Sequence, residues 1–253
     1  MGNFEIHEVG PDVFLSGVGG VLPRGVAAAR KNMKGCGSVQ SIWWQLFDIL
    51  GTMAFALSGT MVGISRRMDV FGVFVLSAAT AVGGGIMRDV LLGTMPPVAL
   101  KDSMYFWIVS CTFVAATFFL RYFNVRRRMF NRFKFIYLLS DAVGLGSFTV
   151  TGTLLACLSF PDSWVFDVTL GVFTAIGGGV IRDVLAGTVP GVLRRDVYAS
   201  ASLAGAVALY ICYHGLMLPI ELAGMICFII TVAIRIIAIM KHWNLPRVRR
   251  RIK

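Results

Sequence analysis

The sequence lacks the polar residues that a soluble protein needs on its surface. Of its 253 residues, 57% are hydrophobic and only 15% are charged, whereas a soluble domain is about 45–50% apolar even when glycine is counted. Apolar runs of about 20 residues, the length that crosses a bilayer, recur along most of the chain. An ordinary soluble domain is therefore excluded, and the composition predicts a polytopic, all-α membrane protein.

Motifs of enzymes and of metal sites are also missing. The five cysteines form no CxxC pair and no Cys/His pattern of the kind that binds zinc. Four of them fall in predicted membrane helices, where a cysteine commonly serves as a small buried apolar residue. His214 stands at a predicted helix end and is expected at the surface. No Walker A, GxSxG or HExxH sequence occurs, so we expect no enzyme activity, disulfide, haem or bound metal.

The positive charge of the chain is distributed as in a membrane protein. A net charge of +11 could indicate nucleic acid binding, but the basic residues lie in short segments between apolar runs. The loops after the first, third and fifth predicted helices, with the C-terminal tail, carry sixteen of the 24 Lys and Arg residues, whereas the opposite side carries five. Basic residues favour the cytoplasmic side. We therefore expect no nucleic acid partner, an inner-membrane location, an outside N-terminus and a cytoplasmic C-terminus.

The apolar runs predict seven membrane helices. They span residues 43–64, 70–92, 103–123, 135–158, 164–187, 197–213 and 218–240. Most are long enough to cross about 30 Å of hydrocarbon, and the sixth is the shortest. Residues 1–42 contain no long apolar run, so we expect a tail without fixed structure, or an over-extended start that precedes a true initiator at Met33. Residues 241–253 are expected to form a basic cytoplasmic tail.

A fifteen-residue stretch occurs twice. Gly83–Pro97 reads GGGIMRDVLLGTMPP and Gly177–Gly191 reads GGGVIRDVLAGTVPG, with ten identical positions where chance would give about one. The similarity extends further, because Asp48 and Gly59 are eleven residues apart, as are Asp141 and Gly152. Such self-similarity marks an internal repeat. Residues 43–123 and 135–213 are thus two copies of a three-helix unit, and the helix at 218–240 stands alone.

The repeat predicts an inverted architecture. Three is an odd number, so the second unit enters the membrane from the opposite side, and a pseudo-two-fold axis in the membrane plane relates the two units. In such proteins, broken helices at corresponding positions usually mark a permeation path or binding site. Glycine weakens a helix. We therefore expect the second and fifth helices to break at two triplets: Gly83, Gly84 and Gly85, and Gly177, Gly178 and Gly179.

Charged residues inside the apolar runs form the other candidate site. A charge in hydrocarbon is costly and usually functional, and the six candidates are Asp48, Arg88, Asp89, Asp141, Arg182 and Asp183. Matched depths predict that Asp48 pairs with Arg88 and that Asp141 pairs with Arg182. Adjacent side chains on a helix diverge, so Arg88 and Asp89 should have different partners. Two interpretations remain open. In the first, the charges set the electrostatic field of a water-filled path. In the second, they form ion pairs that only join the repeats, and the glycines only allow the helices to pack closely.

These features resemble a known family. Two three-helix units and a seventh helix, with GGGxxRDVLxGTxP in both units, are similar to prokaryotic members of the trimeric intracellular cation (TRIC) channel family, also described as a glycine transporter domain family. The resemblance covers residues 43–240. It implies a homotrimer with a pore in each protomer, kinks at the glycine triplets, and passage of K⁺ and, less readily, Na⁺. The expected partners are other copies of the chain and membrane lipids, and no cofactor is implied apart from the permeant ion.

Two function classes remain open at the level of sequence. One is a passive cation channel with a path of several weak sites, preferring K⁺. The other is a secondary transporter for glycine or another small amino acid, with coupling ions at the broken helices. Both use inverted repeats. A scaffold subunit is the third class, and the charges within the membrane helices argue against it.

Overall fold

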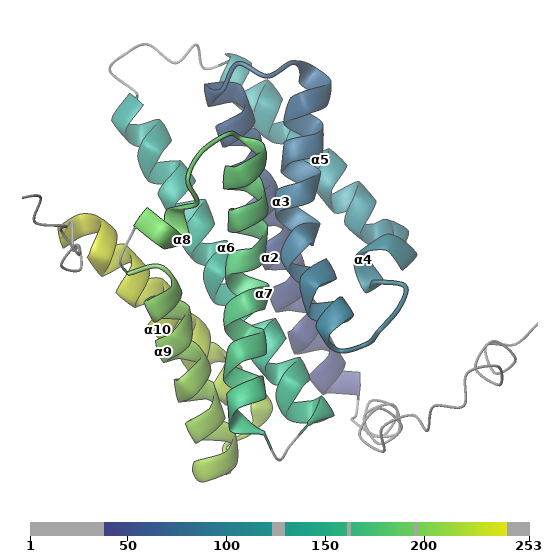
Figure 1. Ribbon diagram of the computed structural model, residues 1–253, viewed down its shortest axis with the longest axis vertical. Coiled ribbons are helices and arrows are strands. Elements are labelled where there is room, and N and C mark those ends of the chain that lie inside the picture. Colours follow the sequence, from purple (N-terminus) through teal and green to yellow (C-terminus); the bar gives the residue numbers. More distant parts are fainter. Residues whose placement is uncertain (1–37, 123–129, 161–162, 195–196, 242–253) are drawn as a thin grey trace, which may run out of the picture.

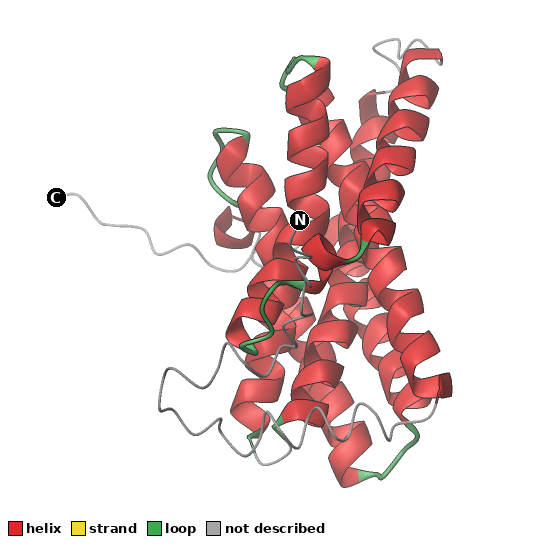
Figure 2. Cartoon of the chain, turned by 90° about the vertical axis from the view of Figure 1, so that its right-hand side faces the viewer, coloured by secondary structure: helices red, strands yellow, loops and turns green. Residues whose placement is uncertain are grey.

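The computed structural model describes residues 38–122, 130–160, 163–194 and 197–241, and these residues contain helices and loops without strands (Figure 2). The long helices are α2 (Ser38–Ser65), α3 (Val70–Leu91), α5 (Ser103–Tyr122), α6 (Phe130–Ser159), α7 (Trp164–Leu185) and α10 (Ile220–Lys241). A shorter helix, α9 (Ala199–Tyr210), continues into a π-helical turn, η2 (Ile211–Gly215). Two four-residue helices, α4 (Val98–Lys101) and α8 (Gly191–Arg194), were not predicted.

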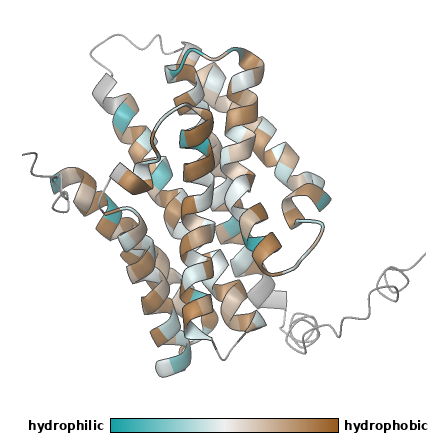
Figure 3. Cartoon of the chain, viewed as in Figure 1, coloured by the Kyte–Doolittle hydropathy of each residue, from teal (hydrophilic) through white to brown (hydrophobic). Residues whose placement is uncertain are grey.

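Six helices in the described ranges are long and apolar enough to cross a membrane. They are α2, α3, α5, α6, α7 and α10, and they correspond to six of the seven predicted spans. The sixth predicted span, residues 197–213, is occupied by α9 and η2, which are shorter. The protein is therefore an all-helical membrane protein, and its hydrophobic residues cover much of the helix surfaces (Figure 3).

The core of the bundle is formed by α2, α3, α6 and α7. α6 packs against α2, α7, α9 and α10, and α3 packs against α2 and α7. Figure 1 shows α5 on one side of this core and α9 with α10 on the other. Phe55 of α2 and Phe148 of α6 are fully buried, with ring centroids 5.2 Å apart in an edge-to-face arrangement. Aromatic pairs of this kind add to the energy of area burial.

The two glycine triplets do not break their helices. α3 is continuous from Val70 to Leu91 through Gly83–Gly85, and α7 is continuous from Trp164 to Leu185 through Gly177–Gly179, so the predicted breaks are wrong. Glycine costs an α-helix only about 1 kcal/mol per residue relative to alanine. Tertiary packing in this bundle outweighs that cost.

The middle glycines of the triplets instead let α3 and α7 touch backbone to backbone. A Cβ atom on Gly84 would overlap the carbonyl oxygen of Thr174 on α7, and a Cβ atom on Gly178 would overlap the carbonyl oxygen of Thr80 on α3. The two contacts are reciprocal, so the same pair of helices is held together by equivalent glycines from the two repeats. Small residues are typical of such close helix crossings in membranes.

The fourth glycine of each motif ends its helix. Gly93 and Gly187 have φ of +70° and +67°, in the left-handed region where other residues are strained. The N–H of Thr94 donates to the carbonyl of Asp89 at 2.8 Å, and the N–H of Thr188 donates to that of Asp183 at 2.9 Å. This is the Schellman pattern of helix termination. The Gly-Thr pair of the repeated motif is therefore a helix stop in both copies.

Candidate functional site

The first charge cluster surrounds Arg88 on α3. Its side chain is only 2% exposed, and Nη1 lies 3.1 Å from Oδ1 of Asp48 on α2, which is the predicted ion pair. Its Nε donates to Oδ1 of Asp89 at 2.9 Å. The hydroxyl of Tyr105 on α5 donates to the other oxygen of Asp48 at 2.5 Å. The guanidinium carbon also lies 5.2 Å from the ring centre of Trp44, within range of a cation–π contact.

The second cluster repeats this geometry around Arg182 on α7. Nη1 lies 2.7 Å from Oδ1 of Asp141 on α6, again the predicted pair, and Nε donates to Oδ1 of Asp183 at 2.9 Å. The hydroxyl of Tyr198 donates to Asp141 at 3.3 Å. The ring of Tyr137 lies 5.2 Å from the guanidinium carbon, where the first cluster has a tryptophan. The repeat in sequence is thus also a repeat in side-chain contacts.

Neighbouring Arg and Asp side chains contact each other, so the expectation that Arg88 and Asp89 have different partners is wrong. The Nε of Arg88 lies 2.9 Å from Oδ1 of Asp89, so the long arginine side chain reaches the carboxylate of the next residue. The second oxygen of Asp89 accepts the backbone N–H of Val98, the first residue of α4, at 2.8 Å. Asp183 likewise accepts the N–H of Gly191 in α8 at 2.7 Å. Each aspartate therefore ties its arginine to the short helix that follows the motif.

The two clusters differ in charge. The first contains two carboxylates and one guanidinium, a formal charge of −1. The second gains Arg235 of α10, whose Nη2 lies 3.9 Å from Oδ2 of Asp141 and whose Nη1 donates to the carbonyl of Val197 at 3.2 Å. Its guanidinium carbon also stands 4.6 Å from the ring centre of Tyr198. The second cluster is therefore formally neutral, and Arg235 of α10, which lies outside the two repeats, creates the difference.

A small cavity adjoins the first cluster. Its volume is about 10 Å³, which is room for about one water molecule. Asp48, Arg88, Tyr105 and Gly85 contribute to its lining. A Cβ atom on Gly85 would have Nη2 of Arg88 as its nearest neighbour, at 3.8 Å, so this glycine has free space beside it. The third glycine of the first triplet thus borders the cavity, whereas the second packs against α7.

Several contacts of the clusters were not predicted from the sequence. Tyr105 and Tyr198 each follow the aspartate that they contact by 57 residues, a repeated spacing that could have revealed them. Ser58, which accepts a hydrogen bond from Arg182 at 2.6 Å, comes from the other repeat and has no such signal. Arg235 also lies outside the repeats, so only the packing of α10 brings it to Asp141.

A family model described as glycine transporter matches residues 45–122 and 138–214 of the chain. These two segments coincide with the two repeat units. Among curated proteins, the UPF0126 inner membrane protein YadS of Escherichia coli K12 is 37% identical over 205 residues, which cover 81% of this chain and 95% of that protein. A UPF0126 membrane protein of Vibrio cholerae is 38% identical over 205 residues, covering 79% of this chain and 81% of that one.

Solved structures with the same fold are ion channels. A prokaryotic TRIC channel crystallised in KCl superposes with a TM-score of 0.73 and 32% identity, covering 81% of this chain and all of the other. A structure described as the basis of conductance through TRIC cation channels has a TM-score of 0.71 and 36% identity, covering 83% of this chain and 98% of the other. The trimeric intracellular cation channel orthologue of Rhodobacter sphaeroides has a TM-score of 0.69 and 32% identity, covering 79% and 98%.

Proposed function

Since this chain belongs to the TRIC cation channel family, we propose that it is a channel for monovalent cations that prefers K⁺. The observation that carries the proposal is the buried charge cluster around Arg88, which adjoins a cavity inside the bundle. A net negative cluster in a low-dielectric interior attracts a cation, and the nearby guanidinium prevents the cation from binding too tightly to leave. Conduction needs this balance of attraction and release.

The path runs along α3 and α7 within one protomer. Each cluster is completed by contacts between helices of the same chain, Asp48 with Arg88 and Tyr105 in the first and Asp141 with Arg182 in the second. These contacts support a separate path in each protomer. In this proposal α2, α3 and α5 form one three-helix unit, α6, α7 and α9 form the second, inverted unit, and α10 is added to them. The inversion would put one charge cluster nearer each membrane face. The glycines serve the path in two ways: Gly84 and Gly178 hold α3 against α7, and Gly85 leaves room beside Arg88.

The assembled protein is a homotrimer in the inner membrane. The relative from Rhodobacter sphaeroides is described as trimeric, and the relative from Escherichia coli is named an inner membrane protein. Membrane lipids cover the outer surfaces of the helices, where large apolar side chains such as Phe71, Phe118 and Leu193 are exposed on the protomer.

Ion passage can be measured directly. Purified protein in liposomes should carry K⁺ down its gradient. Gly85→Val should lower the K⁺ flux by at least about tenfold, because raising the barrier to ion passage by about 1.4 kcal/mol is sufficient for a tenfold decrease in rate. Ala115→Val is the matched control, since Ala115 is exposed on α5. Equal flux in the two variants would reject the path beside Gly85. Glycine counterflow without K⁺ flux would instead support the secondary transporter for glycine or another small amino acid.

The orientation of the chain is a separate prediction. The excess of Lys and Arg on one side places the C-terminus in the cytoplasm and the N-terminus outside. A fluorescent protein fused after Lys253 should therefore fluoresce in cells, and alkaline phosphatase fused at the same place should be inactive. Active phosphatase would invert the whole assignment, including which charge cluster lies nearer the cytoplasm.

A further inference from the structure

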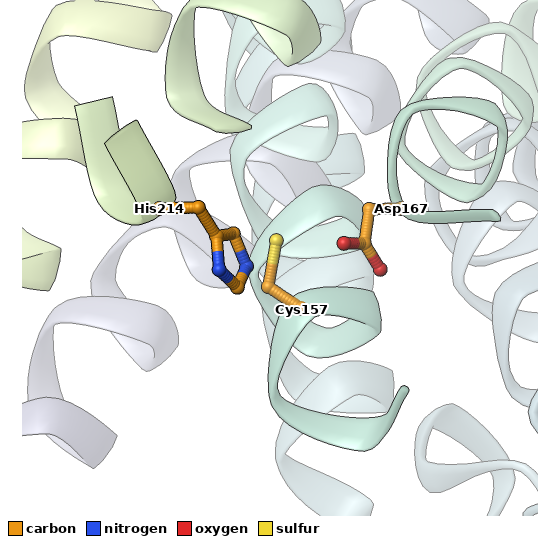
Figure 4. Close-up of side chains that lie close together, drawn as sticks. All are labelled: Cys157, Asp167 and His214. Carbon is orange, nitrogen blue, oxygen red and sulfur yellow. The ribbon is translucent and has the colours of Figure 1, made fainter. Parts of the chain in front are cut away.

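Three potential metal ligands meet away from the charge clusters. Cys157 lies near the end of α6, Asp167 lies in the first turn of α7, and His214 lies in the π-helical turn η2. One ligand atom of each, the thiol sulfur, a carboxylate oxygen and an imidazole nitrogen, lies within 4.8 Å of the other two. Figure 4 shows the imidazole of His214 and the carboxylate of Asp167 on either side of the Cys157 thiol, with the three side chains coming from separate helical segments.

The carboxylate of this cluster is buried without an adequate partner. Asp167 is completely buried, and no N–H or O–H group of the described residues donates a hydrogen bond to either of its oxygens. Only the thiol of Cys157, a weak donor, interacts with it. The Nε2 atom of His214 is also buried, and no group of the residues that the structure describes forms a hydrogen bond with it. A buried polar group without a partner costs folding free energy, so such groups usually form a hydrogen bond, pair with an opposite charge or coordinate a metal ion.

The imidazole is held in place by its neighbours. Its ring lies 4.8 Å from the ring of Tyr210 and 4.9 Å from that of Tyr213, measured between centroids. The π-helical turn that contains His214 is a rare conformation that occurs frequently at functional sites. The histidine is therefore positioned toward Cys157 by both backbone and packing.

Cysteine, histidine and aspartate also occur together in catalytic sites with a cysteine nucleophile, but the geometry here disfavours that function. Such a site needs the histidine between the cysteine and the acid, so that the acid orients the imidazole. Here the thiol of Cys157 stands between the imidazole and the carboxylate (Figure 4). The imidazole and the carboxylate both face the thiol, and one potential ligand atom of each residue lies within 4.8 Å of the other two, so all three could bind one ion.

The cluster belongs to one repeat only. The two repeats are related by the offset between Asp48 and Asp141 and by that between Gly83 and Gly177. With these offsets, the residues of the first unit that correspond to Cys157, Asp167 and His214 are Ile64, Val73 and Arg121. This set does not form a metal site. The three ligand types are therefore not inherited from the repeated architecture, and the shared charge clusters do not require them.

We propose that Cys157, Asp167 and His214 bind a zinc ion. Thiolate, imidazole and carboxylate together suit Zn²⁺, and three protein ligands leave a fourth position for water. Ligand atoms around tetrahedral zinc lie about 3.5 Å apart, given bonds of about 2.0–2.3 Å. Small side-chain rotations from the present separations of up to 4.8 Å would achieve this. The ion would compensate the buried carboxylate and join α6, α7 and η2.

The site can be tested on the wild-type protein. The intact protein, purified without a polyhistidine tag and stripped with chelator, should take up about one Zn²⁺ per protomer by elemental analysis. Co²⁺ should replace it and show a thiolate charge-transfer band together with the visible bands of tetrahedral cobalt. The absence of stoichiometric uptake, or cobalt spectra without the thiolate band, would overturn the assignment.

Variants separate the three ligands from other groups. Cys157→Ala, Asp167→Asn and His214→Ala should each weaken Zn²⁺ binding by well over tenfold, since loss of even an outer-shell partner typically costs 10–100-fold. Cys227→Ala is the control, because Cys227 is an equally buried thiol outside the cluster. Zn²⁺ should also raise the melting temperature of the wild type and the control but not that of the three variants. Equal Zn²⁺ affinity in Cys157→Ala and Cys227→Ala would reject the site.

Discussion

Replacing Asp141 by asparagine is expected to lower the free energy of unfolding by about 3–5 kcal/mol, the cost of removing one partner from a buried ion pair. Asp141 lies between two buried guanidiniums, with Arg182 at 2.7 Å and Arg235 at 3.9 Å. After the substitution, Asp183 remains the only carboxylate in the cluster as described. Two positive charges then share one negative charge in a low-dielectric interior.

Thermal or denaturant unfolding in detergent measures this effect, and two further substitutions calibrate it. Asp48→Asn should cost less than Asp141→Asn, because it leaves Arg88 alone with Asp89 rather than two arginines with one acid. Asp102→Asn is the neutral control, since Asp102 is exposed and its carboxylate accepts a local hydrogen bond from the backbone N–H of Met104. Identical stabilities for Asp141→Asn and Asp102→Asn would mean that the cluster is hydrated rather than buried.

Gly84→Ala should destabilise the bundle by about 1–3 kcal/mol or more, the range for overpacking a close contact. The added methyl group would overlap the backbone carbonyl of Thr174, and a carbonyl within a helix cannot move aside as a side chain can. α3 and α7 must therefore separate. Gly178→Ala should have a similar effect through Thr80, and the two substitutions together should prevent recovery of a monodisperse trimer after detergent extraction.

Gly85→Ala is the matched control for this prediction. It lies next to Gly84 in the same helix, yet its new Cβ atom would meet nothing closer than 3.8 Å. Alanine also favours the helical state by up to about 1 kcal/mol, so stability should be unchanged or slightly increased. Melting curves of Gly84→Ala and Gly85→Ala measure this difference in stability. Equal melting temperatures would show that the helices have space at Gly84 and that the close crossing is wrong.

Sequence periodicity and repetition predicted most of the elements. Apolar runs located the six long helices, because the length of an apolar segment is a local property of the sequence and must match the thickness of the hydrocarbon core of the bilayer. The duplicated Asp and Arg predicted both ion pairs, since a charge in a membrane helix needs an opposite charge at the same depth. The helix stops at Gly93 and Gly187 are also marked in the sequence, where a Gly-Thr pair follows an apolar run in both copies of the motif.

What the sequence by itself determined was the class of protein, the approximate positions of its helices and the pairing of Asp48 with Arg88 and Asp141 with Arg182. The tertiary structure alone decided that the glycine triplets lie in continuous helices, that Arg235 joins the second cluster, and that Cys157, Asp167 and His214 meet. The reason is that residue spacing specifies local geometry and repetition. Contacts between distant segments depend on how closely helices pack, and this is set by side chains from several helices at once.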